Sequence, residues 1–288
     1  MAAKVLITGA SGGIGAAVAR ACAARGAWPI VGYCGRRQAA VETVAQCAAG
    51  EILALDLERE GLGLAGPVPA ANKIVHCAGL HSPERSLLAA STADLQSLFA
   101  VHVFGPLRLT QALLAAGAPV DHVLFVLSSA AGCRGGGPYA LSKAAALAAC
   151  KLLARELAPR GVRLTAVVPG WTETPMAEAA ARDAGRSLDE IRSQHLDGRI
   201  LAADEVGPWC AELLFDAPAQ SPAELIVWDR RDAREPVRLD FERVFSLDRR
   251  MDFQSVEDDG PEVHPTKSDG PDVHPTGQRA IGRPVRQF

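Results

Sequence analysis

The chain has 288 residues, of which 48% are hydrophobic and 22% charged, which is typical of a globular protein with one large or two small domains. With 30 basic and 33 acidic residues its formal net charge is −3, so no general basic field attracts nucleic acid, and we expect none as a partner. No apolar run approaches the roughly 20 residues that cross a bilayer, and the N-terminus has no signal-peptide pattern, so we expect a cytoplasmic protein without a membrane partner.

Up to about residue 230, short apolar runs alternate with Ala- and Leu-rich stretches of helical period. Several of the runs are continuously apolar, as parallel strands buried on both faces are. The expected strands are 4–8, 29–33, 52–55, 73–76, 122–127, 162–168 and 225–228, and the expected helices are 13–25, 38–48, 92–116, 138–158 and 204–215. This alternation predicts an α/β domain over residues 1–230, a doubly wound parallel sheet of the Rossmann type in three αβα layers.

The sequence changes character after residue 229, where we expect a C-terminal extension. Residues 231–250 combine many charges with a few apolar anchors and fit an amphipathic helix. Residues 251–288 are rich in proline and glycine, and the segment 259–266 recurs almost unchanged at 269–276, which predicts a disordered tail. The scattered cysteines and histidines lack the spacing of metal ligands, so we predict no metal site.

A glycine-rich turn follows the first expected strand and opens the first helix. Gly9, Gly13 and Gly15 allow a tight turn and let backbone N–H groups approach a pyrophosphate, with Ser11 and Ile14 in the same loop. The positive end of the following helix adds to the attraction of a phosphate. The loop therefore predicts a dinucleotide site, with a tight turn that binds no ligand as the alternative.

The end of the second expected strand discriminates between the two nicotinamide dinucleotides. An NAD site usually has an acidic residue here, which binds both ribose hydroxyls, but the first acid in this stretch is Glu42. Arg36 and Arg37 occupy the position instead, and a guanidinium group binds a 2′-phosphate bidentately. The pair predicts NADP(H) in preference to NAD(H); the alternative is two solvated arginines at the start of a helix.

Tyr139 and Lys143 lie four residues apart at the start of the expected helix 138–158, so their side chains share one helix face. A free phenol titrates near pH ~10 and is a poor base at neutrality. A nearby ammonium group favours the phenolate and makes tyrosine a usable proton donor and acceptor. The pair predicts an acid–base site at the sheet edge where ligands bind in such folds.

The glycine loop, the Tyr-x-x-x-Lys pair and their order resemble the short-chain dehydrogenase/reductase family, in its simple single-domain form, over about residues 3–229. The resemblance implies an NADP-dependent oxidoreductase that transfers a hydride between the nicotinamide and a ketone or secondary alcohol. It implies that Ser129 binds the carbonyl, that Tyr139 transfers the proton, and that Lys143 binds the nicotinamide ribose. It also implies further cofactor contacts, at Asp56, Ala78, Gly79, Pro169, Gly170, Thr172 and Thr174.

Three departures from the family pattern bear on catalysis. The family's Asn-Asn-Ala-Gly segment after the fourth strand reads His-Cys-Ala-Gly at 76–79. His102 stands where the family has the asparagine of its catalytic tetrad, and it either relays protons near neutral pH or has no catalytic role. Only ten positions separate Ser129 from Tyr139, so we expect a shortened, flexible loop beside the active site.

Two other functions fit the same scaffold. An epimerase or dehydratase acting on a nucleotide-bound sugar is disfavoured by the glycine spacing and by the lack of a sizeable C-terminal substrate domain. A catalytically impaired, dinucleotide-binding regulatory protein is the alternative that His76 and His102 favour. The family resemblance further implies a small carbonyl or alcohol substrate bound by residues 171–200, and a homo-oligomer, either dimer or tetramer, formed through the helices 92–116 and 138–158.

Overall fold

In the computed structural model, the described residues are 2–64, 66–132, 136–216, 223–239 and 241. An eight-stranded sheet runs through them in the order β10-β9-β6-β5-β4-β1-β2-β3. All its neighbouring strands are parallel except the last pair, β10 and β9. The strands are β1 (Lys4–Ile7), β2 (Trp28–Tyr33), β3 (Glu51–Ala54), β4 (Lys73–His76), β5 (His122–Val126), β6 (Arg163–Pro169), β9 (Ala223–Trp228) and β10 (Val237–Leu239).

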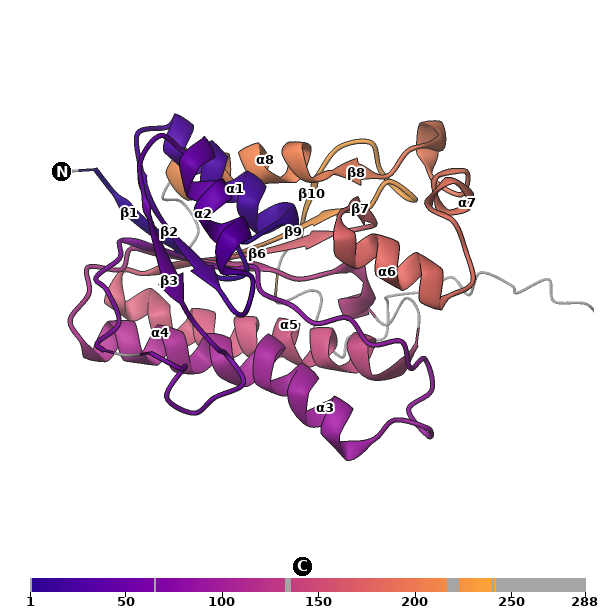
Figure 1. The fold of residues 1–288 in the computed structure, drawn as a ribbon, viewed down its shortest axis with the longest axis horizontal. Coiled ribbons are helices and arrows are strands. Elements are labelled where there is room, and N and C mark those ends of the chain that lie inside the picture. Colours follow the sequence, from indigo (N-terminus) through magenta and orange to yellow (C-terminus); the bar gives the residue numbers. More distant parts are fainter. Residues whose placement is uncertain (1, 65, 133–135, 217–222, 240, 242–288) are drawn as a thin grey trace, which may run out of the picture. The chain divides into compact units, whose positions relative to one another are not determined.

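Helices cover both faces of this sheet, as Figure 1 shows. One face carries α1 (Gly13–Ala24), α2 (Arg37–Gln46) and α8 (Ala203–Phe215), and the other carries α3 (Thr92–Phe99), α4 (Gly105–Ala115) and α5 (Gly137–Leu157). Each face has its own apolar core, because the side chains of central strands alternate between the two sides. The predicted doubly wound, three-layer fold is therefore confirmed.

The strand order reverses between β1 and β4, which are direct neighbours. The chain builds outward from β1 to β3 and then returns to β4 on the other side of β1. At such a switch point the connections leave the carboxyl ends of the two strands in opposite directions, and a crevice opens between them. The glycine-rich turn follows β1 at this point, so the fold presents it to the crevice.

The predicted helix 92–116 is divided in three, because a π-helical turn at Ala100–Phe104 separates α3 from α4. Pro106 supplies a local reason, since it has no N–H for the carbonyl of His102 four residues earlier. By length and composition, Thr92–Ala115 is also apolar enough to cross a membrane, which the sequence prediction did not identify. Its buried leucines, such as Leu109 and Leu113, belong to the core of the sheet domain, and a core helix passes the same test.

Residues 171–200, expected to bind substrate, form a small layer of their own. It contains β7 (Thr172–Glu173), α6 (Pro175–Asp183) and α7 (Leu188–Arg192), and β7 pairs with β8 (Leu201–Ala202). Ser187 and Glu190 start α7 with a reciprocal capping box. The sequence analysis had assigned no secondary structure to these residues.

The beginning of the C-terminal extension differs from the predicted amphipathic helix. Val237–Leu239 form β10, which pairs antiparallel with β9. Without β10, β9 would be an edge strand with unpaired backbone groups, which a further strand satisfies. Phe241 is buried in the sheet's core, so the fold extends past the predicted boundary at residue 230. The remainder of the extension, and the tail 251–288, lie outside the described residues.

Candidate active site

A cavity of about 680 Å³ lies at the carboxyl ends of the parallel strands, and residues that follow β1 to β6 line it. It is lined by most of the predicted cofactor residues, namely Gly9, Ser11, Gly13, Ile14, Gly15, Arg36, Asp56, Ala78, Gly79, Tyr139, Lys143, Pro169, Gly170, Thr172 and Thr174. Ser129 lines it as well, whereas Arg37 and His102 are not among the described lining residues. The fold thus gathers distant motifs around one space.

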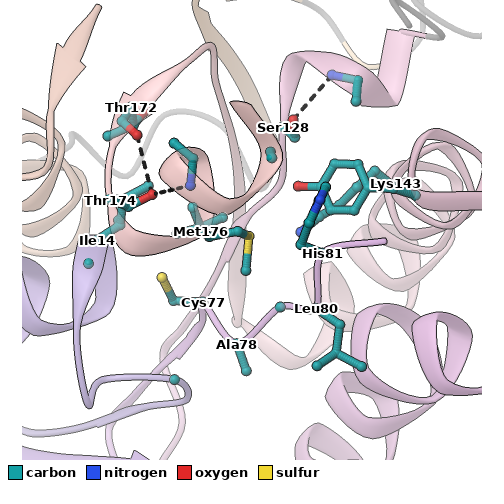
Figure 2. A pocket seen from close by; sticks show the side chains of 18 of the residues that line it. Ile14, Cys77, Ala78, Leu80, His81, Ser128, Lys143, Thr172, Thr174 and Met176 are labelled. Atoms are coloured by element: carbon teal, nitrogen blue, oxygen red, sulfur yellow. Dashed lines mark hydrogen bonds between the residues drawn. The ribbon is translucent and has the colours of Figure 1, made fainter. Parts of the chain in front are cut away.

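The glycine turn packs directly against the turn that follows β4. Gly9 has a φ of +68°, and a Cβ atom there would lie 2.6 Å from the Cα of Ala78, so only glycine fits. The hydroxyl of Thr8 accepts hydrogen bonds from the N–H groups of Cys77 and Ala78, both at 3.0 Å. In Figure 2, Cys77 and Ala78 lie between Ile14, Thr172 and Thr174 on one side of the cavity and Ser128 and Lys143 on the other.

The histidine that replaces the family's asparagine is the last residue of β4, and its side chain belongs to the core. His76 is buried, and its Nε2 lies 2.9 Å from the hydroxyl of Thr110 in α4. Its ring packs against Phe125, with the centroids 4.5 Å apart. Burial lowers the pKa of His76 to about 3, so the ring is neutral at physiological pH.

The two arginines after β2 have different positions. Arg36 lines the cavity, and its guanidinium nitrogens lie 3.6 Å from the place where a Cβ of Gly12 would be. Arg37 is the first residue of α2 and is exposed. Asp56, which follows β3, lines the same cavity and forms an ion pair with Arg59 at 3.1 Å.

Ser129, Tyr139 and Lys143 meet in the cavity from two elements. Ser129 begins the short 3₁₀ turn after β5, and the other two project from the first turns of α5. Lys143 is buried, with its Nζ 5.8 Å from the centroid of the Tyr139 ring. Gly137 has a φ of +82°, and a Cβ there would lie 2.6 Å from the carbonyl oxygen of Glu84. The loop before α5 therefore ends against this neighbouring segment.

His102 lies behind Tyr139 in a continuous chain of hydrogen bonds. Its Nε2 accepts from the backbone N–H of Leu80 at 3.0 Å, so the ring proton of the neutral form is on Nδ1, 2.8 Å from the hydroxyl of Ser142. Ser142 donates in turn to the carbonyl of Tyr139 at 2.7 Å. Burial, and secondarily the charge of Lys143, lower the pKa of His102 well below its ordinary value. Both ring nitrogens thus already have partners, which speaks against a proton relay.

An ion pair that the sequence analysis missed contacts the serine. Nη2 of Arg231 lies 3.3 Å from Oγ of Ser129 and 2.6 Å from a carboxylate oxygen of Asp229. Burial would raise the pKa of the Asp229 carboxyl, but hydrogen bonds from Arg231 lower it below its usual value. Their position in the sequence could have indicated a role in the site. Both residues lie within three positions of the end of the last predicted strand, 225–228, at the sheet edge where ligands bind.

Residues 9–229 match the family model described as enoyl-(acyl carrier protein) reductase, which covers most of the chain. A curated relative, the short-chain reductase protein NovJ of Streptomyces niveus, is 28% identical over 235 residues, 75% of this chain and 87% of that protein. The chain belongs to the short-chain dehydrogenase/reductase family.

Other members of the short-chain dehydrogenase/reductase family agree in extent and fold. The 3-oxoacyl-[acyl-carrier-protein] reductase FabG of Escherichia coli is 29% identical over 240 residues, 77% of this chain and 93% of that protein. A short-chain dehydrogenase from Burkholderia cenocepacia, solved in complex with NADP, superposes with a TM-score of 0.65 and 26% identity, and covers 80% of this chain and 97% of that one. The similarity thus spans more than nine-tenths of the length of these two proteins.

Proposed function

We propose that the protein is an NADP(H)-dependent oxidoreductase that transfers a hydride between the nicotinamide and a small ketone or secondary alcohol, with Tyr139 as the general acid and base. The observation that carries this proposal is the meeting of the glycine loop with Ser129, Tyr139 and Lys143 in one cavity. The family's oxidoreductases act on such groups, and several solved relatives are complexes with NADP.

The residues that line the cavity fit a dinucleotide. Gly9 and Gly13 both have positive φ angles, which a glycine turn uses to aim its N–H groups at a pyrophosphate. Arg36 lies over this turn and would bind the 2′-phosphate, with Arg37 next to it in sequence. Asp56 would bind near the adenine. Residues 169–174 would hold the nicotinamide and its phosphates, together with Ala78 and Gly79.

The bound cofactor would supply the hydride. The protein's side chains would stabilise the negative charge on the substrate oxygen and transfer the proton. The hydroxyls of Ser129 and Tyr139 donate hydrogen bonds to the substrate oxygen, which gains negative charge in the transition state. Tyr139 passes its proton to this oxygen in reduction and receives it back in oxidation. The ammonium group of Lys143 favours the phenolate left on Tyr139 and would bind the nicotinamide ribose.

We retain His102 in the site as a positioning residue. Its neutral ring joins the backbone of Leu80, at the cavity wall, to Ser142, whose hydroxyl holds the Tyr139 carbonyl. This chain fixes the first turn of α5, and with it the direction of the phenol.

The decisive test is NADPH oxidation with a panel of ketones by the wild-type protein and by Tyr139→Phe. We expect turnover in the wild type and a loss of about a thousandfold in kcat in the variant, because the proton donor is removed. NADPH binding, followed by fluorescence titration, should be retained in both. If both proteins bind NADPH and neither reduces any carbonyl, the regulatory alternative replaces the reductase.

We further propose that the protein is cytoplasmic and self-associates through α4 and α5. Three large apolar side chains are exposed in the isolated chain: Phe104, which directly precedes α4, and Leu141 and Leu152 on α5, with exposures of 50%, 42% and 58%. Exposed apolar groups on neighbouring helices favour association. Sedimentation should show a dimer or tetramer, and Leu152→Glu should shift it toward the monomer.

A further inference from the structure

Ser129 contacts a charged side chain that the proposed reaction does not use. Arg231 lies three residues beyond the end of β9 and lines the same cavity as Ser129 and Tyr139. Its Nη2 donates a hydrogen bond to Ser129 Oγ at 3.3 Å. The Ser129 hydroxyl also hydrogen-bonds the carboxylate of Asp229, so it turns away from Asp229 when it donates to a substrate oxygen in the cavity.

Asp229 fixes the direction of the Arg231 guanidinium. One carboxylate oxygen accepts from Nε at 3.1 Å and the other from Nη2 at 2.6 Å. Asp229 is buried, and the room for it exists because residue 170 is glycine, where a Cβ would lie 2.7 Å from the carboxylate. Nη1 of Arg231 donates no hydrogen bond to any of the described residues. A guanidinium N–H that is held in one direction can donate a charge-assisted hydrogen bond to a carboxylate.

The cavity also holds charges that are not assigned to the cofactor. Arg85, Arg186 and Arg231 line it. Glu58 and Glu84, which line it as well, and the buried Asp229 equal these three charges in number. A carboxylate on the substrate would therefore be recognised through the direction of the Arg231 N–H groups and not through an excess of positive charge.

We propose that Arg231 binds a carboxylate of the substrate, which is therefore a 2-oxo or 3-oxo acid. The proposal rests on the proposed reductase function, because it takes Ser129 as the group that binds the reacting carbonyl. Nη1, the nitrogen left for the substrate, is bonded to the same carbon as Nη2, which lies 3.3 Å from Ser129 Oγ. Nη1 and Oγ can therefore reach two oxygens of one small unit. The ketone and carboxylate of a 2-oxo or 3-oxo acid form such a unit, whereas a more distant carboxylate would leave one donor unused. Leu80, Trp171 and Met176 line the cavity and suit an apolar chain on the other side of the ketone.

The test compares an oxo acid with its uncharged ester, 2-oxo-4-phenylbutanoate and its ethyl ester, as substrates with NADPH. We expect the wild type to favour the acid at least about tenfold in kcat/KM, and Arg231→Gln to lower kcat/KM for the acid about a hundredfold but for the ester about tenfold or less. The matched control is Arg234→Gln, which removes an exposed arginine that is paired with Asp197 and is not a described lining residue. Arg234→Gln should keep the wild-type ratio of kcat/KM for the acid to kcat/KM for the ester.

A binding measurement separates recognition from chemistry. The alcohol 2-hydroxy-4-phenylbutanoate does not react with NADPH, so calorimetry on the protein with NADPH measures its affinity directly. Arg231→Gln should weaken this binding at least about tenfold, through loss of a charged hydrogen bond. If Arg231→Gln does not fold, Arg231→Lys decides, because it lacks the second guanidinium nitrogen and should lower the acid-to-ester ratio several-fold.

Three results would overturn the proposal. They are equal use of acid and ester by the wild type, a parallel loss of both substrates in Arg231→Gln, or a preference for a neutral thioester such as the N-acetylcysteamine thioester of a 3-oxo acid. Each of them still involves turnover of ketones, so the reductase function would survive. Absence of any ketone turnover, with NADPH bound, would instead remove the proposed function itself.

Discussion

The cavity has two sides that the sequence encodes differently. On what we call the cofactor side, the glycine loop and Arg36 each follow their strand, β1 or β2, within a few residues. On the substrate side, Ser129 meets Arg231, although they lie 102 positions apart and follow β5 and β9. The cofactor side is therefore specified by local turns, whereas the substrate side depends on the register of strands that pair late in the chain.

The largest effect is expected on the cofactor side, at Gly9, where the glycine loop packs against the turn after β4. In Gly9→Ala the new Cβ would meet the backbone of Ala78 at 2.6 Å, in addition to the cost of a φ of +68°. Because backbone does not yield as a flexible side chain does, we expect a loss of ~3 kcal/mol or more in unfolding free energy and at least ~100-fold in NADPH affinity. Denaturant unfolding measures the loss of unfolding free energy, and fluorescence titration measures the loss of NADPH affinity.

Gly26 is the matched control for that substitution. It has a φ of +77°, and nothing lies within 4 Å of its would-be Cβ. Gly26→Ala should therefore cost only about 1 kcal/mol of backbone strain and leave NADPH binding unchanged. Equal effects of the two substitutions would show that the close approach of the glycine loop to the turn after β4 is unimportant.

The histidines are unevenly distributed, because none precedes His76 and the segment that forms the glycine loop and Arg36 therefore has none. His76, His102 and His122 are all buried, and burial lowers the pKa of His76 and His122 to about 3 and that of His102 well below its ordinary value. The unfolded chain binds protons at these residues below pH ~6.5, while the folded chain does not. Stability is thus fully present above this pH and is lost progressively as the pH falls.

Three such groups predict a fall of about 4 kcal/mol in unfolding free energy per pH unit below pH ~6, at about 1.4 kcal/mol per histidine. Urea unfolding between pH 7 and pH 5 measures this slope. His76→Asn removes one of the groups and can still bond to Thr110, so its slope should be smaller by about a third. An unchanged slope in this variant would mean that His76 is protonated in the folded protein.

The same contrast between the two sides explains what the sequence could predict. The seven strands and the cofactor loop follow from local apolar runs and turn residues, and the structure contains them all. The helices α6 and α7 were missed because they rest on a small cluster around Ile191, not on the main core. The contact of Arg231 with Ser129 follows from the register that pairs Pro169 with Trp228, which no local pattern reveals.

A smaller effect distinguishes the two arginines on the cofactor side. Both are exposed, but Arg36 lines the cavity, whereas Arg37, the first residue of α2, is not among the described lining residues. We expect Arg36→Ala to weaken NADPH binding about 10- to 30-fold, through loss of charge-assisted bonds to the 2′-phosphate, with NADH binding unchanged. Arg37→Ala should change NADPH affinity less than about threefold. Similar losses in both variants would restore the equal roles that the sequence suggested.

The smallest expected effect tests whether the substrate side is fixed from behind. Ser142→Ala removes the hydroxyl between His102 Nδ1 and the Tyr139 carbonyl, with bonds of 2.8 and 2.7 Å, and leaves every lining side chain in place. We expect kcat to fall about three- to tenfold, or roughly 1 kcal/mol, with KM and NADPH affinity nearly unchanged. Ser142→Thr, which keeps the hydroxyl, should restore most of the rate. If Ser142→Ala changes stability but not kcat, the hydrogen-bond chain through His102 holds the helix without directing the phenol.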